Sequence, residues 1–297
     1  MVEPVRFRFH AETGATNVFQ LQAPLDPAEA AEVSRLAVTQ HRALRDLLIT
    51  NGVTVTSCRA LETTPDAPFC NNWFSTHVAS ASAPATLVLY PLLAAARRLE
   101  RRGDLIALLQ PAYPRILDLS EAEIEGHYLE STGSLCLHHP SGTAFAGLSA
   151  RTDPTLAATW ARETGHQLVT FTATDAGGVP YYHTNVMMFI GHGIAGVTLE
   201  GLEDADERAR VSGALSAAGL EVVPITREQA AKFCGNAIAL SSESGEPLLV
   251  MSSAAWHGFE AAQRAILSRH ARLLHTDLSA FERVGGGSAR CLIAELF

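Results

Sequence analysis

The feature that most limits the possible folds of this chain is a repeated order of local signals. In each repeat an amphipathic helix ends at a small residue and a short apolar strand follows at once. Asp26-Pro27-Ala28-Glu29 predicts a capped helix that runs to Asn51-Gly52, and Val53–Ser57 predicts its strand. The order returns at Arg97–Gly103 into Leu105–Leu109, Thr155–Gly165 into Gln167–Phe171, Ala205–Gly219 into Glu221–Ile225, and Ala254–Arg272 into Leu273–Thr276. We therefore expect five similar α/β units along the 297 residues.

Polar clusters recur in phase with this repeat. They are Pro65–Trp73 (PDAPFCNNW), Glu130–Gly133, His183–Asn185, Cys234–Asn236 and Gly285–Cys291. In a ring of similar units, residues at one phase share one radius and height, so these clusters would meet at the axis. The alternative is ordinary α/β alternation in a doubly wound sheet, which predicts no such phasing. No linker divides the chain, and we expect a single domain over residues 1–297.

The charge balance excludes several classes of partner. Lys+Arg 22 against Asp+Glu 31 leaves a net charge of -9, so there is no basic surface for nucleic acid. Prolines interrupt the charge-poor stretch Val78–Ala96 and glycines interrupt Ala176–Leu199, so we expect no membrane span. The charged N-terminus lacks a secretory signal, which predicts a cytoplasmic protein. The sequence leaves a homodimer open.

Cys291 is the strongest candidate for a nucleophile. Three glycines precede it, and Leu292-Ile293-Ala294 predicts a buried strand after it. The five cysteines form no CxxC pair, as expected for free thiols in a reducing compartment. A small apolar core residue is the alternative interpretation of Cys291, and it is the one we keep for the other cysteines.

Three further residues have the chemistry that a cysteine nucleophile needs. His183, between Tyr181-Tyr182 and an apolar run, is a candidate acid and base, although a structural histidine would fit there too. Glu130, before a turn, could orient its imidazole, or be a solvated loop residue. Asp66, between two prolines, could bind substrate N–H groups, or cap a turn.

Metal and nucleotide sites lack their usual residues. The chain has no HExxH motif, His138 and His139 would face opposite sides of a strand, and no GxGxxG opens a helix. Lys232 is the single lysine, so Schiff-base chemistry has one weak candidate. We expect neither a metal nor a cofactor.

Several ordered motifs resemble the guanidino-group modifying enzymes of the pentein superfamily, most closely the arginine-deiminase-related, citrulline-utilisation hydrolase branch. The resemblance covers nearly the whole chain. It includes the segments FHAET (9–13), NVFQ (17–20), PDAPFCNNWFSTH (65–77), Arg97-Arg98, LESTGSL (129–135), LSART (148–152), YHTNVMM (182–188) and GGGSARCLIAE (285–295).

This resemblance implies a fold and a set of roles. The fold is a five-bladed α/β propeller of ββαβ units with pseudo-fivefold symmetry around a narrow polar channel. Cys291 would be the nucleophile, His183 the general acid and base, and Glu130 its orienter. Asp66 would bind the terminal nitrogens of the substrate. Arg151, with Arg97 or Arg98, would bind its α-carboxylate, because a guanidinium can contact a carboxylate through two N–H groups.

Two departures from the family pattern bear on the substrate. Arginine-processing relatives usually have carboxylates where this chain has Asn72 and Asn185. An amide can donate to a ureido oxygen and accept from its NH₂, so the two asparagines favour a neutral head group such as that of citrulline. A third departure is Cys70, where the branch usually has proline; we expect it near the site.

The sequence therefore predicts a cysteine-dependent hydrolase that cleaves a C–N bond of a small ureido or guanidino amino acid. Citrulline, giving ornithine, CO₂ and ammonia, is the first choice. The alternatives are an arginine deiminase or a dimethylarginine-type hydrolase that gives citrulline, and an amidinotransferase. A pure binding role is the remaining alternative, since some proteins of this fold lack the nucleophile.

Overall fold

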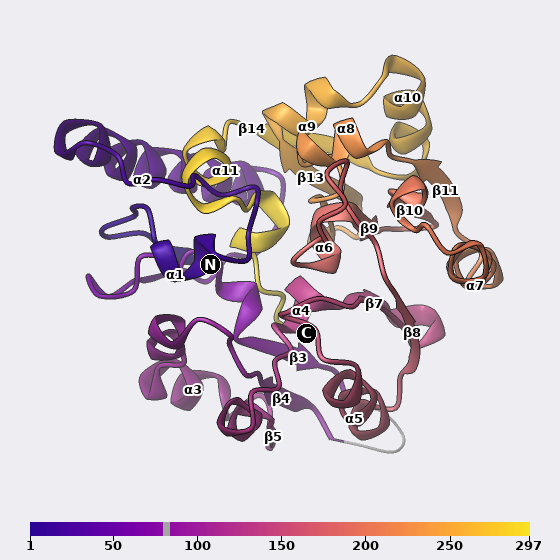
Figure 1. The fold of residues 1–297 in the computed structure, drawn as a ribbon, viewed down its shortest axis with the longest axis horizontal. Coiled ribbons are helices and arrows are strands. Elements are labelled where there is room, and N and C mark those ends of the chain that lie inside the picture. Colours follow the sequence, from indigo (N-terminus) through magenta and orange to yellow (C-terminus); the bar gives the residue numbers. More distant parts are fainter. Residues whose placement is uncertain (80–83) are drawn as a thin grey trace.

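The computed structural model describes residues 1–79 and 84–297 and places small sheets around a common centre (Figure 1). In each of the four three-stranded sheets, the middle strand pairs antiparallel with the strand before it and parallel with the strand after it. Blade 1 contains β3 (Phe74–His77), β4 (Thr86–Leu89) and β5 (Arg115–Asp118); blade 2 contains β6 (Cys136–His138), β7 (Thr143–Gly147) and β8 (Gln167–Phe171); blade 3 contains β9 (Met188–Ile190), β10 (Ile194–Val197) and β11 (Glu221–Pro224); blade 4 contains β12 (Ile238–Ser241), β13 (Pro247–Ser252) and β14 (Arg272–Thr276).

The fifth unit is shorter. Blade 5 pairs β1 (Val2–Glu3) in parallel with β2 (Cys58–Arg59), and α1 (Ala11–Gly14) and the long α2 (Pro27–Thr50) connect them. The predicted α/β propeller of five similar units is thereby confirmed. That residues 1–297 form a single domain stays a prediction.

Two sets of helical segments complete the units. The outer set follows the second strand of each blade and lies at the periphery in Figure 1. It comprises η2 (Ala95–Glu100), α3 (Gly103–Leu109), α5 (Pro154–Thr164), η5 (Leu199–Gly201), α7 (Ala205–Ala217), α9 (Ser253–Gly258) and α10 (Ala261–His270). Two short segments lie elsewhere: η3 (Ser120–Ile124) follows β5, and η4 (His139–Ser141) joins β6 to β7. The inner set comprises η1 (Cys70–Asn72), α4 (Ser131–Ser134), α6 (Thr184–Met187), α8 (Arg227–Ala231), α11 (Ser279–Gly285) and η6 (Ala289–Leu292).

Helix α2 shows how the sequence determines an outer element. Asp26 accepts hydrogen bonds from the N–H groups of Ala28 and Glu29, and Gly52 ends the helix with φ 77. Its buried face includes Val33, Ala37, Leu44 and Leu48, spaced four or seven residues apart. The predicted cap, first-turn proline and helix end are confirmed.

Three of the predicted strands are wrong. Leu105–Leu109 is helical in α3, because Leu105, Ile106 and Leu109 form one apolar helix face that packs on blade 1. The strand of that unit is β5. Residues 53–57 form no strand, and pairing with β1 begins only at Cys58.

The third error follows Cys291. Leu292-Ile293-Ala294 joins no ladder, because side chains occupy its carbonyl groups: Cys70 Sγ donates to Leu292 O (3.6 Å), and Arg290 Nη1 donates to Ile293 O (3.0 Å). Cys70 itself packs with Val2, Ala60 and Ala67.

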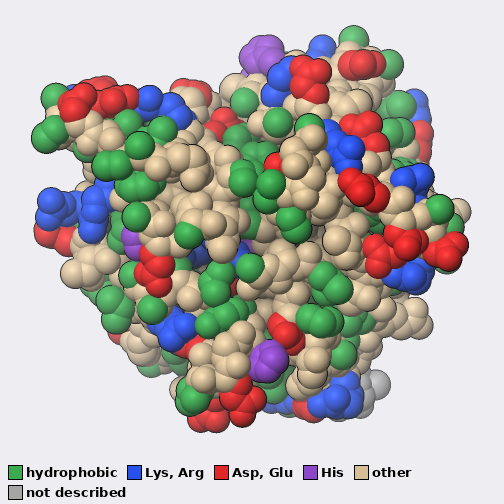
Figure 2. Space-filling view, in the orientation of Figure 1, with side chains coloured by type: hydrophobic (Ala, Val, Ile, Leu, Met, Phe, Trp, Pro, Cys, Tyr) green, Lys and Arg blue, Asp and Glu red, His purple; other side chains and the backbone are tan. Residues whose placement is uncertain are grey.

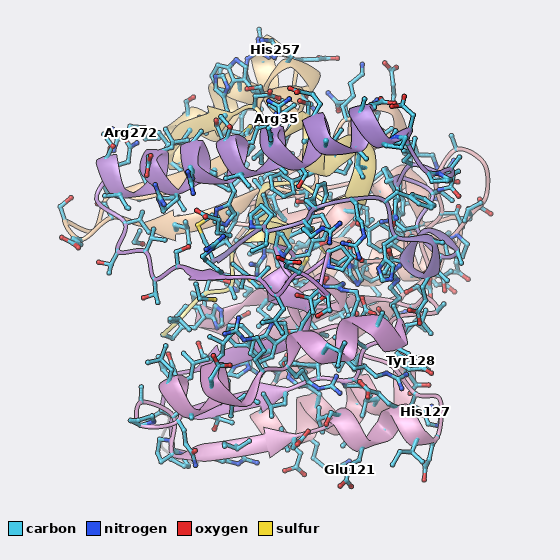
Figure 3. All side chains as sticks on the ribbon, turned by 90° about the vertical axis from the view of Figure 1, so that its left-hand side faces the viewer. Arg35, Glu121, His127, Tyr128, His257 and Arg272 are labelled. Carbon is cyan, nitrogen blue, oxygen red and sulfur yellow. The ribbon has the colours of Figure 1, made fainter. Side chains whose placement is uncertain are left out.

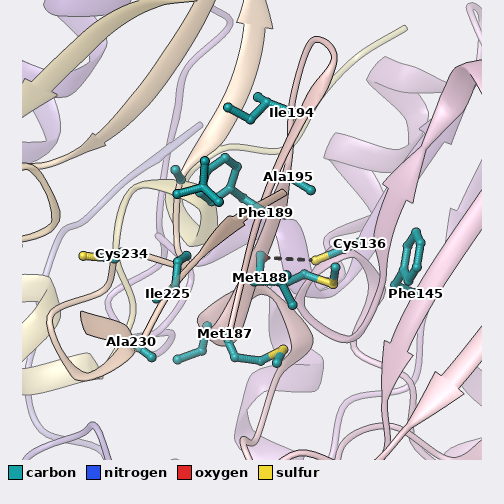
Figure 4. Packing of buried hydrophobic residues seen from close by; sticks show 14 of the residues in the cluster. Cys136, Phe145, Met187, Met188, Phe189, Ile194, Ala195, Ile225, Ala230 and Cys234 are labelled. Carbon is teal, nitrogen blue, oxygen red and sulfur yellow. Dashed lines mark hydrogen bonds between the residues drawn. The ribbon is translucent and has the colours of Figure 1, made fainter. Parts of the chain in front are cut away.

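The blades contact one another through separate apolar clusters, several of which include residues of two neighbouring blades. Figure 4 shows Met187, Met188 and Phe189 of blade 3 beside Cys136 of blade 2, whose Sγ donates to Met188 O (3.3 Å). Between blades 3 and 4 the backbones touch, since a Cβ at Gly235 would lie 2.3 Å from Val186 O. Packing of this kind fixes the inner turns relative to one another.

Charged side chains gather on the rim of the propeller in the face that Figure 2 shows, over the outer helices. Figure 3 places Glu121, His127 and Tyr128 at the outer edge, just before the chain turns inward at Glu130. Among the helices of residues 1–79 and 84–297, none combines the length and apolarity that crossing a bilayer requires.

Candidate active site

The inner turns bring the polar clusters together at the centre of the ring. Asn72 lies in η1 before β3, Glu130 is the N-cap of α4 before β6, and His183 is the N-cap of α6 before β9. Cys291 lies in η6 after α11. Each comes from a different unit at the same phase, as the repeat predicted.

Glu130 and His183 form a fully buried pair, with 2.7 Å between Glu130 Oε2 and His183 Nε2. Burial alone would raise the pKa of Glu130, but Arg151 and the hydrogen bond with His183 lower it on balance. Burial lowers the pKa of His183 to about 4, although Glu130 opposes that shift. The ring is therefore neutral near pH 7, with its proton on Nε2 facing the carboxylate.

The other ring nitrogen of His183 is unengaged. Nδ1 is buried and has no hydrogen-bond partner among the described residues. Since Nε2 carries the proton, Nδ1 has its lone pair available. The arrangement can accept a proton at Nδ1 and stabilise the resulting imidazolium through Glu130.

Arg97 is held by other protein groups. Its Nε and Nη2 bind both oxygens of Glu100 (2.9 Å each), Nη2 also donates to Phe69 O (3.1 Å), and Nη1 donates to Asn72 Oδ1 (2.8 Å). Asn72 Nδ2 in turn donates to Asn71 Oδ1 (3.0 Å). Of the five N–H groups of Arg97, one on Nη1 remains for a ligand.

Arg151 is similarly engaged. Its Nη1 lies 3.3 Å from Glu130 Oε2, Nη2 donates to Thr13 O (2.8 Å), and Nε and Nη2 both donate to Thr16 Oγ1. The guanidinium stacks over Tyr182, 5.0 Å from the ring centroid. One N–H of Nη1 again remains, so each arginine can offer a single-point contact rather than the two-point contact we expected.

Asp66 has a histidine as its counter-charge. His10 Nδ1 lies 2.5 Å from Asp66 Oδ2, and Thr13 Oγ1 donates to the same oxygen (3.2 Å). The hydrogen bond that His10 donates to Asp66 raises the pKa of His10, with burial opposing. Asp66 is buried, and His10 is partly exposed.

Cys291 is buried among amides. Asn236 Nδ2 lies 3.3 Å from its Sγ, and Asn185 Nδ2 lies 3.8 Å from it. Burial raises the pKa of the Cys291 thiol, while hydrogen bonds from the Ser288 backbone and from the Asn236 side chain lower it. The sulfur therefore lies in a polar but uncharged environment.

A small pocket of about 20 Å³ joins these groups. Its walls are Thr13, Asn17, Asp66, Phe69, Asn72, Arg97, Arg151, Tyr182, His183, Gly285, Gly287 and Cys291. A much larger hollow of about 970 Å³ is lined by Thr132 and Asn185 but not by His183 or Cys291. The small pocket is the candidate active site, because the titratable groups converge there.

The structure places most of the predicted site residues at this pocket. Asp66, Asn72, Arg97, Arg151, His183 and Cys291 line it, and Glu130 lies directly behind His183. Asn185 does not line it; its side chain lies behind the sulfur, toward the larger hollow. Arg98 binds Leu92 O and Glu123, away from the pocket, which decides between the two arginines. Cys70 is also outside its lining.

Sequence reasoning missed several residues of the site. Thr13, Asn17 and Tyr182 line the pocket, and all three stand in motifs that carried the resemblance. Asn236 was seen only as part of a polar cluster in phase with the repeat. No group of three or more His, Cys, Asp or Glu side chains within residues 1–79 and 84–297 is arranged to hold a metal ion.

Comparison with known proteins gives one family and several structural neighbours. Residues 3–297 match the family model described as N,N dimethylarginine dimethylhydrolase, eukaryotic. No curated protein sequence matches the chain.

The structural neighbours share the fold at low sequence identity. ArgZ, an arginine dihydrolase from the ornithine–ammonia cycle in cyanobacteria, aligns with a TM-score of 0.76 and 16% identity over 98% of this chain, which spans 39% of ArgZ. The N-terminal domain of ArgZ, in a mutant form bound to substrate, aligns at 0.75 and 15% identity, with 98% and 95% covered. A dimethylarginine dimethylaminohydrolase adduct aligns at 0.64 and 15% identity, with 98% and 96% covered.

The family match extends over nearly the whole chain, and the fold agrees with it. This chain belongs to the N,N-dimethylarginine dimethylhydrolase family, within the pentein superfamily of guanidino-group modifying enzymes.

Proposed function

We propose that this protein is a cysteine-dependent hydrolase of a small ureido or guanidino amino acid, with citrulline as its preferred substrate and ornithine as a product. The observation that carries this proposal is the small pocket, where a cysteine, an unengaged imidazole nitrogen and a carboxylate meet.

The charges of the pocket support a neutral head group. Each lining arginine has a buried carboxylate beside it, Glu100 for Arg97 and Glu130 for Arg151. Asp66 is the one lining carboxylate, and His10 is its partner. With His10 protonated, Asp66 has no unbalanced charge to offer a guanidinium, whereas a ureido group needs only hydrogen bonds.

The first half of the reaction transfers a carbamoyl group to sulfur. His183 Nδ1 takes the thiol proton of Cys291 as the sulfur attacks the ureido carbon. The tetrahedral centre collapses when the bond from carbon to the ornithine Nδ breaks, and His183 returns the proton to that nitrogen. Ornithine leaves, and an S-carbamoyl cysteine remains.

The second half returns the enzyme. His183 Nδ1 takes a proton from water, whose oxygen attacks the carbamoyl carbon. The carbon–sulfur bond breaks, and the proton passes to the sulfur. Carbamate is released and decomposes to CO₂ and ammonia, so one water is consumed in each turnover of this step.

The remaining lining groups bind and orient the substrate. Arg97 and Arg151 each contact the α-carboxylate through one free N–H, and Asp66 accepts from the terminal NH₂. The developing oxyanion needs donors, for which the backbone N–H groups of Gly287 and Ser288 and the Asn72 amide are the candidates, since the N–H of Gly286 donates to Glu282 O. Asn185, behind the sulfur, is placed to act on Cys291 instead.

Arginine is the second candidate substrate, favoured by the presence of the Asp66 carboxylate in the lining. Attack on a guanidinium would expel ammonia first and give citrulline after hydrolysis. The neighbour ArgZ is named an arginine dihydrolase. A site that hydrolyses arginine twice passes through citrulline and ends at ornithine.

Product analysis tests the proposal. The purified protein is incubated with citrulline, arginine, and methylated arginines, with and without an added amine, and the products are identified by mass. Citrulline consumed with ornithine formed is the expected result. Conversion of arginine or methylarginine to citrulline, with no further reaction, would favour the deiminase or the dimethylarginine-type hydrolase. Transfer of the amidine group to the added amine would favour the amidinotransferase.

The covalent step has its own test. Rapid acid quench should trap a peptide containing Cys291 with a mass increase of about 43 Da, the mass of HNCO. Cys291→Ala is the matched control and should show neither adduct nor turnover. Full hydrolysis by that variant would overturn the proposed nucleophile.

A further inference from the structure

The nearest polar side chain to the Cys291 sulfur belongs to a residue with no assigned role. Asn236 comes from the turn between α8 and β12 of blade 4, and its Nδ2 lies 3.3 Å from Sγ. It is fully buried and does not line the small pocket. It therefore approaches the sulfur from the side away from the substrate.

The orientation of this amide is fixed by the backbone around it. Its Oδ1 accepts from the N–H of Arg290 (3.1 Å), and its Nδ2 donates to the carbonyl of Asn185 (2.8 Å). A flipped amide would place its oxygen against the Asn185 carbonyl and its NH₂ group against the Arg290 N–H. Neither pair can form a hydrogen bond, so the orientation of the amide is determined. One N–H of Nδ2 serves the Asn185 carbonyl, and the other lies within reach of both the Cys291 sulfur and Asn185 Oδ1, each 3.3 Å from Nδ2.

The imidazole does not fill this role. His183 Nε2 is bound to Glu130, and within the described residues Nδ1 hydrogen-bonds to no group, the Cys291 sulfur included. An imidazolium–thiolate ion pair is therefore not the resting arrangement. A buried thiolate needs donors nonetheless, because burial disfavours its charge.

We infer that Asn236 is a further catalytic residue: its NH₂ group donates to Cys291 Sγ and stabilises the thiolate from behind while His183 remains free to handle protons. This inference rests on the proposed function, in which Cys291 is the nucleophile. Asn185 assists at longer range, with its Nδ2 held by Thr132 O (3.1 Å). The amide bond to sulfur also fixes the direction from which the thiolate attacks.

The titratable groups near the Cys291 sulfur are bound to other partners, so they do not replace the Asn236 amide as its donor. Arg290, the preceding residue, is bound to Glu295 (2.8 Å). Tyr182 donates its hydroxyl to Gly286 O (2.6 Å). Cys136 donates to Met188 O, so it offers the Cys291 sulfur no proton.

Thiol titration without substrate tests the inference. The rate of iodoacetamide labelling at Cys291 is measured against pH by peptide mass spectrometry, in the full chain. Asn236→Ala removes the donor without adding charge, and Asn236→Asp keeps the oxygen that accepts from Arg290. Both should move the labelling midpoint up by about one pH unit or more. Asn185→Ala should move it less, because its nitrogen is farther from the sulfur.

Asn71→Ala is the control, since Asn71 is also a buried amide but bonds to Thr132 and Asn72 rather than to the sulfur. Its labelling midpoint should stay where the unmodified protein has it. An unchanged midpoint in a folded Asn236 variant would overturn the inference.

A measurement on the unmodified protein tests the inference even if the Asn236 variants fail to fold. The side-chain amide resonances of Asn236 should titrate together with the thiol and should lose that transition in Cys291→Ser. Absence of a common transition would also overturn the inference. If no substrate of the panel is hydrolysed while these transitions persist, the proposed function fails and the thiolate contact stands.

Discussion

The neutral His183 ring depends on Glu130 for its tautomer. The carboxylate accepts from Nε2, which leaves Nδ1 without a partner among the described residues and available as the proposed base. Without that acceptor, either ring nitrogen could carry the proton. The tautomer that has its lone pair on Nδ1 would then no longer be favoured.

Glu130→Gln should therefore lower kcat by about 10²–10⁴-fold, since a misdirected imidazole is a poor proton carrier. The same change leaves the buried Arg151 cation without its carboxylate, so a melting curve must accompany the kinetics. Turnover within about twofold of the unmodified protein in a folded variant would exclude this role.

His10 sets the charge that Asp66 presents to a substrate. It is held by Asp66 and lies near Glu12, 3.9 Å away, with Arg97 opposing its protonation. Because its pKa is raised, the protonated form persists to higher pH than in a free histidine. Loss of that proton leaves Asp66 as an unbalanced anion.

His10→Gln should raise kcat/KM for arginine relative to citrulline, because the variant offers a guanidinium an uncompensated carboxylate. In the unmodified protein the same preference should grow as pH rises through the raised pKa of His10, and the variant should lose that pH dependence. The ratio of the two kcat/KM values at several pH values measures it. A ratio that is the same in both proteins at low pH would contradict the role of His10.

At this scale the sequence predicts the residues that stand in distinctive motifs. Cys291 after three glycines, His183 beside an apolar run and Asp66 between prolines all reach the pocket. The direction of a side chain depends on contacts between blades, which is why Asn185 was expected at the substrate and Asn236 was not assigned.

The short inner helices hold the site through close backbone contacts. At Gly133 of α4, a Cβ would lie 2.6 Å from Asn72 Nδ2 and 2.8 Å from His183 Nδ1. Only a glycine lets α4 approach both groups. Ser131, two residues before Gly133, has φ 47, so the turn after Glu130 is already strained.

Gly133→Ala should displace His183 and Asn72 and reduce kcat by about 10²-fold, since misplacement of about 1 Å has such effects. Gly213→Ala is the matched control: Gly213 lies inside α7 with no atom within 4 Å of its Cβ position. It should stabilise the protein by about 0.4–1 kcal/mol and keep full activity. Equal activities of the two variants would contradict this account of α4.

The elements that the sequence predicted well are those with caps at both ends. Helices α2, α5 and α7 start at Asp26, Asp153 and Asp204, whose side chains accept from first-turn N–H groups. Leu105–Leu109 is a short apolar run, for which helix and strand periodicities are hard to separate. Packing of its face on blade 1 decided in favour of the helix.

The whole molecule contains histidines that are buried in the neutral form. Burial lowers the pKa of His41 to about 4, of His77 to about 3 and of His183 to about 4. Unfolding restores values near 6.5, so the unfolded chain binds protons more tightly. Their contribution to stability is therefore complete above about pH 6.5 and is lost as the pH falls toward the folded pKa values.

The free energy of unfolding should fall between pH 7 and pH 5, with His41 alone contributing about 2 kcal/mol of that fall. His41 lies on α2 among apolar residues, and neither ring nitrogen has a partner within the described chain. Denaturant titrations at the two pH values measure the difference, and His41→Leu should reduce it. If the variant showed the same pH dependence as the unmodified protein, groups other than His41 would cause the fall in the free energy of unfolding.

The closed ring explains how residues far apart along the chain meet. Asn72, Glu130, His183, Asn236 and Cys291 occupy successive units, and each inner turn points to the same centre. The repeat made the architecture predictable from local signals. The incomplete fifth unit was not predictable. Its strands β1 and β2 lie on either side of α2 in the sequence, so they pair only when the folded chain brings them together.

The small pocket has room for about one or two water molecules, since each needs roughly 10–15 Å³ of such space. An amino acid with an extended side chain is far larger, so the walls of the pocket must move apart before it can bind. Ligand capture should accordingly be slower than diffusional encounter and should level off at high ligand concentration, at a rate set by the protein rather than by the ligand.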